Sequence, residues 1–239
     1  MKRVKRLITT LLSLTMLIAT LALSAQNEGT ITLEITDVSS DNPQVASYAD
    51  MMKGNQTFVY FKESTSLTKI NMMGGMVKVD IKVDEEESTD VLMEMMGQKI
   101  WVNTTKAESD RMKAESDNPM AEMDIAYDEG DTKTIAGYEC YKMSVEFPDA
   151  PEGSLTAYIT DDISVRPPII NGVEVSEFKG FPLEYTFNNS MMSLTVTTTS
   201  FEQSVDDGVF ALNTSGYQKM TMQEFMDMMG SMGGGNFGF

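Results

Sequence analysis

Histidine is absent from this chain of 239 residues, and its absence excludes several kinds of chemistry. Imidazole is the usual general base near neutral pH and a common ligand of zinc. Without it, Ser-His-Asp catalysis, Cys-His catalysis and His-ligated zinc sites cannot form. The chemistry that remains uses paired carboxylates, a Ser-Lys nucleophile, or calcium bound by oxygen ligands.

Cysteine occurs once, as Cys140, so no intrachain disulfide can form even in an oxidising compartment. It lies in the strand-like segment 137–142, directly after Glu139. A neighbouring carboxylate raises the pKa of a thiol, which disfavours a reactive thiolate. We therefore predict that Cys140 is buried and inert, because a small buried thiol behaves as a hydrophobe.

Long hydrophobic runs are confined to the start of the chain. Basic residues within positions 2–6 precede an uncharged stretch at 7–23, and small residues end that stretch before Gln26. This order is typical of a secretory signal peptide, and we predict cleavage between Ala25 and Gln26. A retained anchor is the alternative, but the hydroxyl-bearing residues within the stretch weaken it. We expect an exported protein of the periplasm or outer envelope of a Gram-negative bacterium, not an integral membrane protein after cleavage.

Positive charge is scarce. The chain has 18 lysines and arginines against 36 acidic residues, and four of the 18 precede the predicted cleavage site. The remaining 14 against 36 give the mature chain a net charge of −22. Nucleic acid and anionic membranes bind clustered lysine and arginine, so we expect no nucleic-acid partner. No phosphate loop or nucleotide fingerprint is present, and we expect no cofactor.

What the mature chain does have is apolar residues that alternate with polar ones. Ile31, Leu33 and Ile35 alternate with polar residues, and the same period of two recurs at 77–84. Such alternation is typical of half-buried antiparallel strands. Further strands are predicted at 57–63, 67–72, 91–95, 99–103, 123–127, 142–147, 155–159, 183–188 and 193–197. The prediction is an α+β, mainly β protein with a many-stranded, mostly antiparallel, strongly twisted sheet and a few covering helices.

Three helices are predicted, at 43–53, 105–116 and 221–230. The last has Thr221 as a candidate N-cap and Glu224 at the third helical position, the pattern of a capping box. No repeat or linker divides the chain. We therefore predict three parts: a signal peptide at 1–25, a single β-rich domain at 26–230, and a disordered glycine-rich tail at 231–239.

Methionine is unusually frequent, with 20 of the 22 methionines in the mature chain. Three interpretations compete: core filling, an adaptable apolar groove, and a thioether site for Cu(I). On the last predicted helix, one face carries four apolar side chains at helical spacing. This candidate face for an apolar ligand or partner consists of Met222, Phe225, Met226 and Met229.

Acidic residues form no recognisable catalytic or metal site. The segments 84–87 and 128–131 are interpreted as solvated turns, and the second lacks the ligand spacing of a calcium-binding hand. The pairs 161–162 and 206–207 are adjacent, and neighbours on a strand point to opposite faces, so neither is a ready acid-base pair. We predict no catalytic residue, no metal site and no enzymatic activity.

Several short segments resemble a known family. The segments 29–31, 96–99, 134–142, 180–185 and 205–217, in this order, are similar to the domain of unknown function 4412 family of exported bacterial proteins. The resemblance covers nearly the whole mature chain. One departure is the lack of a proline between Phe210 and the Gly-Tyr pair that ends the last segment.

The resemblance implies an envelope protein without established activity and with a LolA/LolB-like fold. That fold is a curved antiparallel sheet, an incomplete barrel, with helices over its concave face. The family has no catalytic residue to carry over. Together these observations predict a non-enzymatic binding or carrier module for an apolar ligand, which is a lipid, an acyl chain or an apolar envelope protein segment. A structural or protein-interaction module is the alternative, and a carboxylate hydrolase or a Cu(I)-binding protein is less favoured.

Overall fold

The computed structural model describes residues 26–40, 42, 46, 51–115, 124–147, 153–164, 169–170, 173–174 and 178–231. Ala25, the predicted tail beyond Ser231 and most of the predicted helix at 43–53 lie outside this part of the chain. Within the described ranges, none of the helices combines the length and the hydropathy of a membrane-spanning segment.

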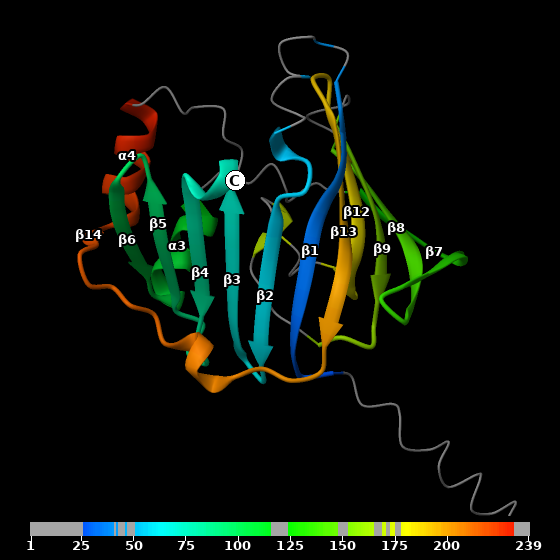
Figure 1. The fold of residues 1–239 in the computed structure, drawn as a ribbon, viewed down its shortest axis with the longest axis horizontal. Coiled ribbons are helices and arrows are strands. Elements are labelled where there is room, and N and C mark those ends of the chain that lie inside the picture. Colours follow the sequence, from blue (N-terminus) through cyan, green and yellow to red (C-terminus); the bar gives the residue numbers. More distant parts are fainter. Residues whose placement is uncertain are drawn as a thin grey trace, which may run out of the picture.

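A single large sheet forms the frame of the molecule (Figure 1). Its order is β14-β6-β5-β4-β3-β2-β1-β13-β12-β9-β8-β7. Its strands are β1 (Glu28–Ser39), β2 (Gln56–Lys62), β3 (Thr65–Met72), β4 (Val77–Val83), β5 (Thr89–Met95), β6 (Gln98–Thr104), β7 (Asp124–Ile135), β8 (Tyr138–Glu146), β9 (Ser154–Thr160), β12 (Phe181–Asn188), β13 (Ser193–Glu202) and β14 (Gln218–Met220). The other elements are a small sheet of β10 (Ile169–Ile170) and β11 (Val173–Glu174), the helices α3 (Lys106–Glu115) and α4 (Met222–Ser231), and the 3₁₀ turns η1 (Met73–Gly75) and η3 (Asp207–Phe210).

The sheet is curved and open, with β14 and β7 at its edges, so the predicted fold class is confirmed. Every neighbouring pair in the large sheet is antiparallel except β14 and β6. That parallel pair forms because the segment 203–217 leaves β13 and runs past the lower ends of β2 to β4, as Figure 1 draws them. The sequence prediction did not include β14, which is only three residues long.

Register places the alternating apolar residues on one face, here called the inner face. Directly opposed residues such as Ile31 and Val59 share a face of an antiparallel pair. The main core covers the inner face of β1, β2, β7 to β9, β12 and β13. Its largest fully buried side chains are Phe61, Ile31, Leu33, Met143, Ile159, Leu183, Val59, Val145 and Val196.

A second, smaller core lies on the inner face of β3 to β5. It consists of Ile70, Val79 and Met93, and Phe225 of α4 packs against it. Through Phe225, α4 therefore contacts the inner face of this half of the sheet. The two cores are separate clusters on one continuous sheet: the larger belongs to β1, β2, β7 to β9, β12 and β13, and the smaller to β3 to β5.

One predicted turn is wrong. The segment 128–131 does not separate two strands but forms a bulge inside β7, where the register with β8 shifts between Asp128 and Thr132. The carboxylate of Asp128 accepts a hydrogen bond from the backbone N–H of Gly130 at 3.0 Å, which closes a local loop. The ladder can then continue on both sides of the extra residues.

Candidate apolar binding site

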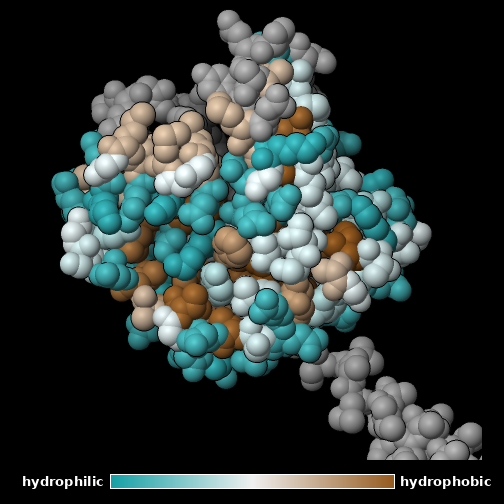
Figure 2. Space-filling model, viewed as in Figure 1, coloured by the Kyte–Doolittle hydropathy of each residue, from teal (hydrophilic) through white to brown (hydrophobic). Residues whose placement is uncertain are grey.

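The large apolar side chains exposed on the described part of the chain share one residue type. Among the described residues, every large hydrophobic side chain that is strongly exposed is a methionine. These are Met51, Met73, Met76, Met96, Met191 and Met226. Figure 2 shows pale brown atoms gathered over the ends of β4 to β6 and α4, at the upper left of the molecule.

Strand direction places the loop methionines at the same end of the sheet. Because β1, β3 and β5 run opposite to β2, β4 and β6, the connections β1–β2, β3–β4 and β5–β6 lie at one end. The β12–β13 connection lies there too, because β13 is antiparallel to β1. Met51, Met73, Met96 and Met191 occupy these four connections. We call this end, together with Met76 and Met226, the methionine end.

Two of these methionines occupy backbone positions that do not suit them. Met96 and Gly97 form the two-residue β5–β6 hairpin with φ values of 52° and 82°, the pattern of a type I′ turn. Met73 begins the β3–β4 connection with φ 53°. Asparagine or glycine is the usual residue at such positions, because a larger L-residue loses about 1 kcal/mol there. Met96 is 93% exposed, so packing does not compensate that cost.

An apolar row leads from these tips onto the inner face. Met72, Val77 and Met95 lie opposite one another on β3, β4 and β5, directly beside the hairpins. All three are half-buried and pack against the smaller core, as Phe225 does. The methionine end and the surface beneath α4 are therefore contiguous.

The side chains of the predicted apolar face on α4 differ in how far they are buried. Phe225 packs inward, Met222 is half-buried, and Met226 is 61% exposed. The side chain of Met229 lies outside the described part of the structure. The capping box forms as predicted: the hydroxyl of Thr221 accepts from the N–H of Glu224, whose carboxylate accepts from the N–H of Thr221 at 2.8 Å.

Tyrosine contacts fix the edge that carries α4. The Tyr217 hydroxyl donates to Glu94 on β5 at 2.7 Å, and Lys99 on β6 contacts the same carboxylate at 2.8 Å. Burial and the adjacent Glu94 raise the pKa of Tyr217 to about 12. The hydrogen bonds from Lys99 and Tyr217 lower the pKa of Glu94. These contacts position β14, and therefore α4, against β6.

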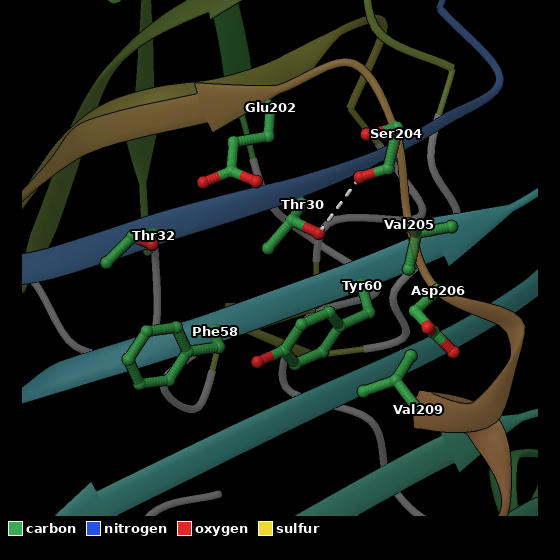
Figure 3. Close-up of a pocket in the computed structure, with 9 residues that line it drawn as sticks. All are labelled: Thr30, Thr32, Phe58, Tyr60, Glu202, Ser204, Val205, Asp206 and Val209. Atoms are coloured by element: carbon green, nitrogen blue, oxygen red, sulfur yellow. Dashed lines mark hydrogen bonds between the residues drawn. The ribbon is translucent and has the colours of Figure 1, made fainter.

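A shallow depression of about 420 Å³ lies on the opposite, outer face of the sheet (Figure 3). The two threonines come from β1, the two aromatic residues from β2, and the rest from the end of β13 and the segment that follows it. Its lining residues are Thr30, Thr32, Phe58, Tyr60, Glu202, Ser204, Val205, Asp206 and Val209. This depression was not among the sites predicted from the sequence. The one feature of the sequence that could have indicated it is the aromatic pair Phe58 and Tyr60, at positions of β2 that point away from the core.

The adjacent acidic pairs are occupied in separate contacts. Asp161 accepts a hydrogen bond from the Tyr141 hydroxyl at 3.1 Å, and Asp207 pairs with Lys62 at 2.6 Å. Asp206 instead caps η3 through the N–H of Gly208. Among the described residues, no group of three or more histidine, cysteine, aspartate or glutamate side chains is arranged to hold a metal ion.

Cys140 is fully buried, as predicted. Its Sγ lies 3.6 Å from the backbone oxygen of Tyr138. Burial raises the pKa of the thiol to about 11, and the carboxylates of Glu184 and Asp162 add to the effect. A raised thiol pKa was predicted from the neighbouring Glu139, whereas burial is its main cause.

Comparison with known proteins gives only distant likenesses. No protein-family profile matches this sequence, and no curated protein matches it. The chain is similar to the Mycobacterium tuberculosis lipoprotein LppX, with 9% identity and a TM-score of 0.34 over 74% of this chain and 88% of that one. A DUF1329 family protein from Desulfovibrio piger has 8% identity and a TM-score of 0.34, over 79% and 91%.

A third likeness is to a chain of the Pseudomonas aeruginosa MucA/MucB complex. It has 8% identity and a TM-score of 0.34, and the match spans 79% of this chain but 56% of that one. Likenesses this distant carry no argument about function. The resemblance to the domain of unknown function 4412 family stays a prediction.

Proposed function

We propose that this chain is a non-enzymatic, exported binding or carrier protein for an apolar ligand: a lipid, an acyl chain or an apolar protein segment. The ligand binds at the methionine end and along the apolar row beneath α4. The observation that carries the proposal is Met96, a 93% exposed apolar side chain at a positive-φ hairpin tip. The leader-like sequence at 1–25 supports a location outside the cytoplasm.

The positive φ of Met96 disfavours a methionine at this position unless its side chain gains contacts with a ligand. A non-glycine residue in the left-handed region is disfavoured by about 1 kcal/mol, and asparagine relieves much of that cost in a type I′ turn. Met73 has the same conformation in the neighbouring hairpin and is 44% exposed. Neither backbone preference nor packing accounts for two methionines here, whereas contact with an apolar ligand does.

Methionine also suits a ligand of variable shape. Its side chain is flexible and polarizable, so a surface built from it adapts to different apolar partners. Four connections and α4 contribute such side chains, and the apolar row at Met72, Val77 and Met95 extends the surface onto the sheet. The half-buried state of that row leaves apolar area for a ligand to cover.

The test is native mass spectrometry of residues 26–239 purified from the cell envelope, with lipid extraction and titration of a fluorescent acyl probe. A co-purifying acyl species or saturable probe uptake supports the proposal. A clean protein that takes up no probe overturns the carrier function and favours a protein-interaction module, which crosslinking in whole cells would detect.

Matched variants locate the site. The double variant M73N/M96N should raise the free energy of unfolding by about 1 kcal/mol per site and weaken probe binding at least about fivefold. The control is A136N. Ala136 and Gly137 form a two-residue hairpin with positive φ at the opposite end of the sheet, so A136N should stabilise without changing binding. Unchanged binding in M73N/M96N would place the ligand elsewhere.

A further inference from the structure

The depression on the outer face is independent of the methionine end. It lies across β1 and β2 on the side of the sheet away from the two cores, and none of its lining residues belongs to either core (Figure 3). Its floor is aromatic and its rim is acidic. The combination indicates a ligand of a different chemical class from the one proposed above.

Two aromatic rings form the floor. Phe58 and Tyr60 project from the same face of β2, with ring centroids 6.4 Å apart and planes inclined by 20°. Their cross-strand partners on β1 are Thr32 and Thr30, which line the depression beside them. Aromatic faces carry a partial negative charge from the ring quadrupole and attract cations.

The wall is a well-fixed segment that follows β13. The Thr30 hydroxyl donates to the backbone oxygen of Ser204 at 3.3 Å, and Lys62 holds Asp207 at 2.6 Å. Asp206 caps η3 by accepting from Gly208 at 2.7 Å. These contacts fix the segment whose Val205 and Val209 line the depression beside the aromatic floor, so the wall is in place before a ligand arrives.

The charges of the lining are all of one sign. Glu202 and Asp206 are acidic, and no lysine or arginine is among the lining residues. Figure 3 shows their carboxylates on two sides of the Tyr60 ring. The nearby Lys62 is engaged by Asp207. The site thus offers two carboxylates and two aromatic faces without a cation of its own.

We propose that this depression binds an organic cation, a quaternary or alkyl ammonium group, over the rings of Phe58 and Tyr60. Glu202 and Asp206 supply the opposite charge, and the valines of the wall contact the alkyl substituents. Ring faces and carboxylates both favour a positive ligand, and together they favour it over a neutral one of the same shape. A saccharide would also stack on the rings, but it would leave the two carboxylates without opposite charge.

The probe pair is choline and its neutral isostere 3,3-dimethyl-1-butanol, titrated into residues 26–239 and followed by NMR chemical shifts. Choline should bind about tenfold more tightly than the alcohol, and added salt should weaken only choline. The shifts should map to β1, β2 and η3. A neutral disaccharide tested in parallel serves as the saccharide control.

Two variants isolate the charges. E202Q/D206N keeps the shape of the site, because asparagine also caps a helix, and should weaken choline binding about tenfold without affecting the alcohol. E85Q/E86Q removes the same charge from the β4–β5 turn and should leave choline binding unchanged. The variant F58L/Y60L tests whether the two aromatic rings contribute to choline binding.

Equal affinity for choline and the alcohol, preference for the disaccharide, or no shifts at millimolar choline would each overturn the proposal. An equal effect of E85Q/E86Q would show attraction by net charge alone and overturn it too. If F58L/Y60L does not fold, E202Q/D206N still decides. Acyl-probe binding and the M73N/M96N variant are measured separately, so failure here is distinguishable from failure of the carrier function.

Discussion

At the scale of single residues, two buried threonine hydroxyls among the described residues lack a hydrogen bond. Thr68 and Thr198 are buried on the inner face, and within the described part of the chain their Oγ1 atoms have no hydrogen-bond partner. Thr68 lies opposite Val59 and Ile81, so its surroundings are apolar on both sides. A buried hydroxyl without a partner costs about 1 kcal/mol or more.

The substitution T68V should therefore raise the free energy of unfolding by about 1 kcal/mol, because valine has nearly the same shape and no hydroxyl to desolvate. Urea unfolding followed by circular dichroism measures it. The matched control is T195V. Thr195 shares a 2.9 Å hydrogen bond with Thr186 on the outer face, so that variant should lose about 1 kcal/mol. A destabilised T68V would mean that the hydroxyl has a partner, such as an internal water.

At the scale of elements, the helices α3 and α4 begin with the same capping arrangement. Thr221 and Glu224 form a capping box on α4, and Thr105 and Glu108 form one on α3. Among the side chains that the structure describes, α4 contributes Phe225 to the smaller core and α3 contributes none. Removing the capping box of α3 therefore tests the effect of helix capping alone. Removing that of α4 tests capping together with the contact between α4 and the apolar row.

The variant T221A should destabilise α4 by about 1 kcal/mol, because it removes the cap. Amide hydrogen exchange in α4 should be about fivefold faster, and acyl-probe binding should change. T105A should loosen α3 equally and leave probe binding unaltered. If T221A speeds exchange without changing the binding, α4 takes no part in the site.

The same variant should alter the response of α4 to acid. Hydrogen bonds from the backbone and hydroxyl of Thr221 lower the pKa of Glu224 below its ordinary 4.5. That contribution is present above pH 4.5 and is lost as pH falls through the lowered value. T221A removes the hydroxyl contribution and keeps the larger one from the backbone N–H, so it should partly flatten the loss of helix stability below pH 4.5, which exchange at several pH values will measure.

Strands and helix starts could be predicted from the sequence where the local residue pattern alone determines them. Alternation identified the strands, and the Thr221 pattern identified the start of α4. The bulge at Asp128 was missed because an Asx loop within a strand and a true turn use the same residues. The depression was missed because it needs β1, β2 and the segment after β13 side by side, which only the topology provides.

At the scale of the whole molecule, the two ends of the sheet differ in chemistry. The methionine end carries exposed thioethers, whereas the connections at the opposite end are rich in acid. These acidic residues are Glu63, Asp84, Glu85, Glu86, Glu87, Asp161, Asp162, Asp206 and Asp207. Repulsion should turn the acidic end away from other anionic surfaces and leave the methionine end toward them. The proposed cation site lies near the acidic end, which concentrates cations around it.

This polarity predicts an order of oxidation by dilute hydrogen peroxide. Exposed thioethers should become sulfoxides first, and peptide mass spectrometry will rank them. Among the described methionines, the early group should be the six of the methionine end, led by the 93% exposed Met96. Met93 and Met143, which are 6% and 0% exposed, should react only when the protein unfolds.

A sulfoxide is polar, so oxidation of the early group should abolish acyl-probe binding while circular dichroism stays unchanged. Bound acyl ligand should protect Met73 and Met96, and methionine sulfoxide reductases should restore binding, which separates this effect from general damage. If Met96 and Met76 are fully oxidised and the probe still binds with unchanged affinity, the methionine end is not the apolar site, and the strained backbone at its tips needs another explanation.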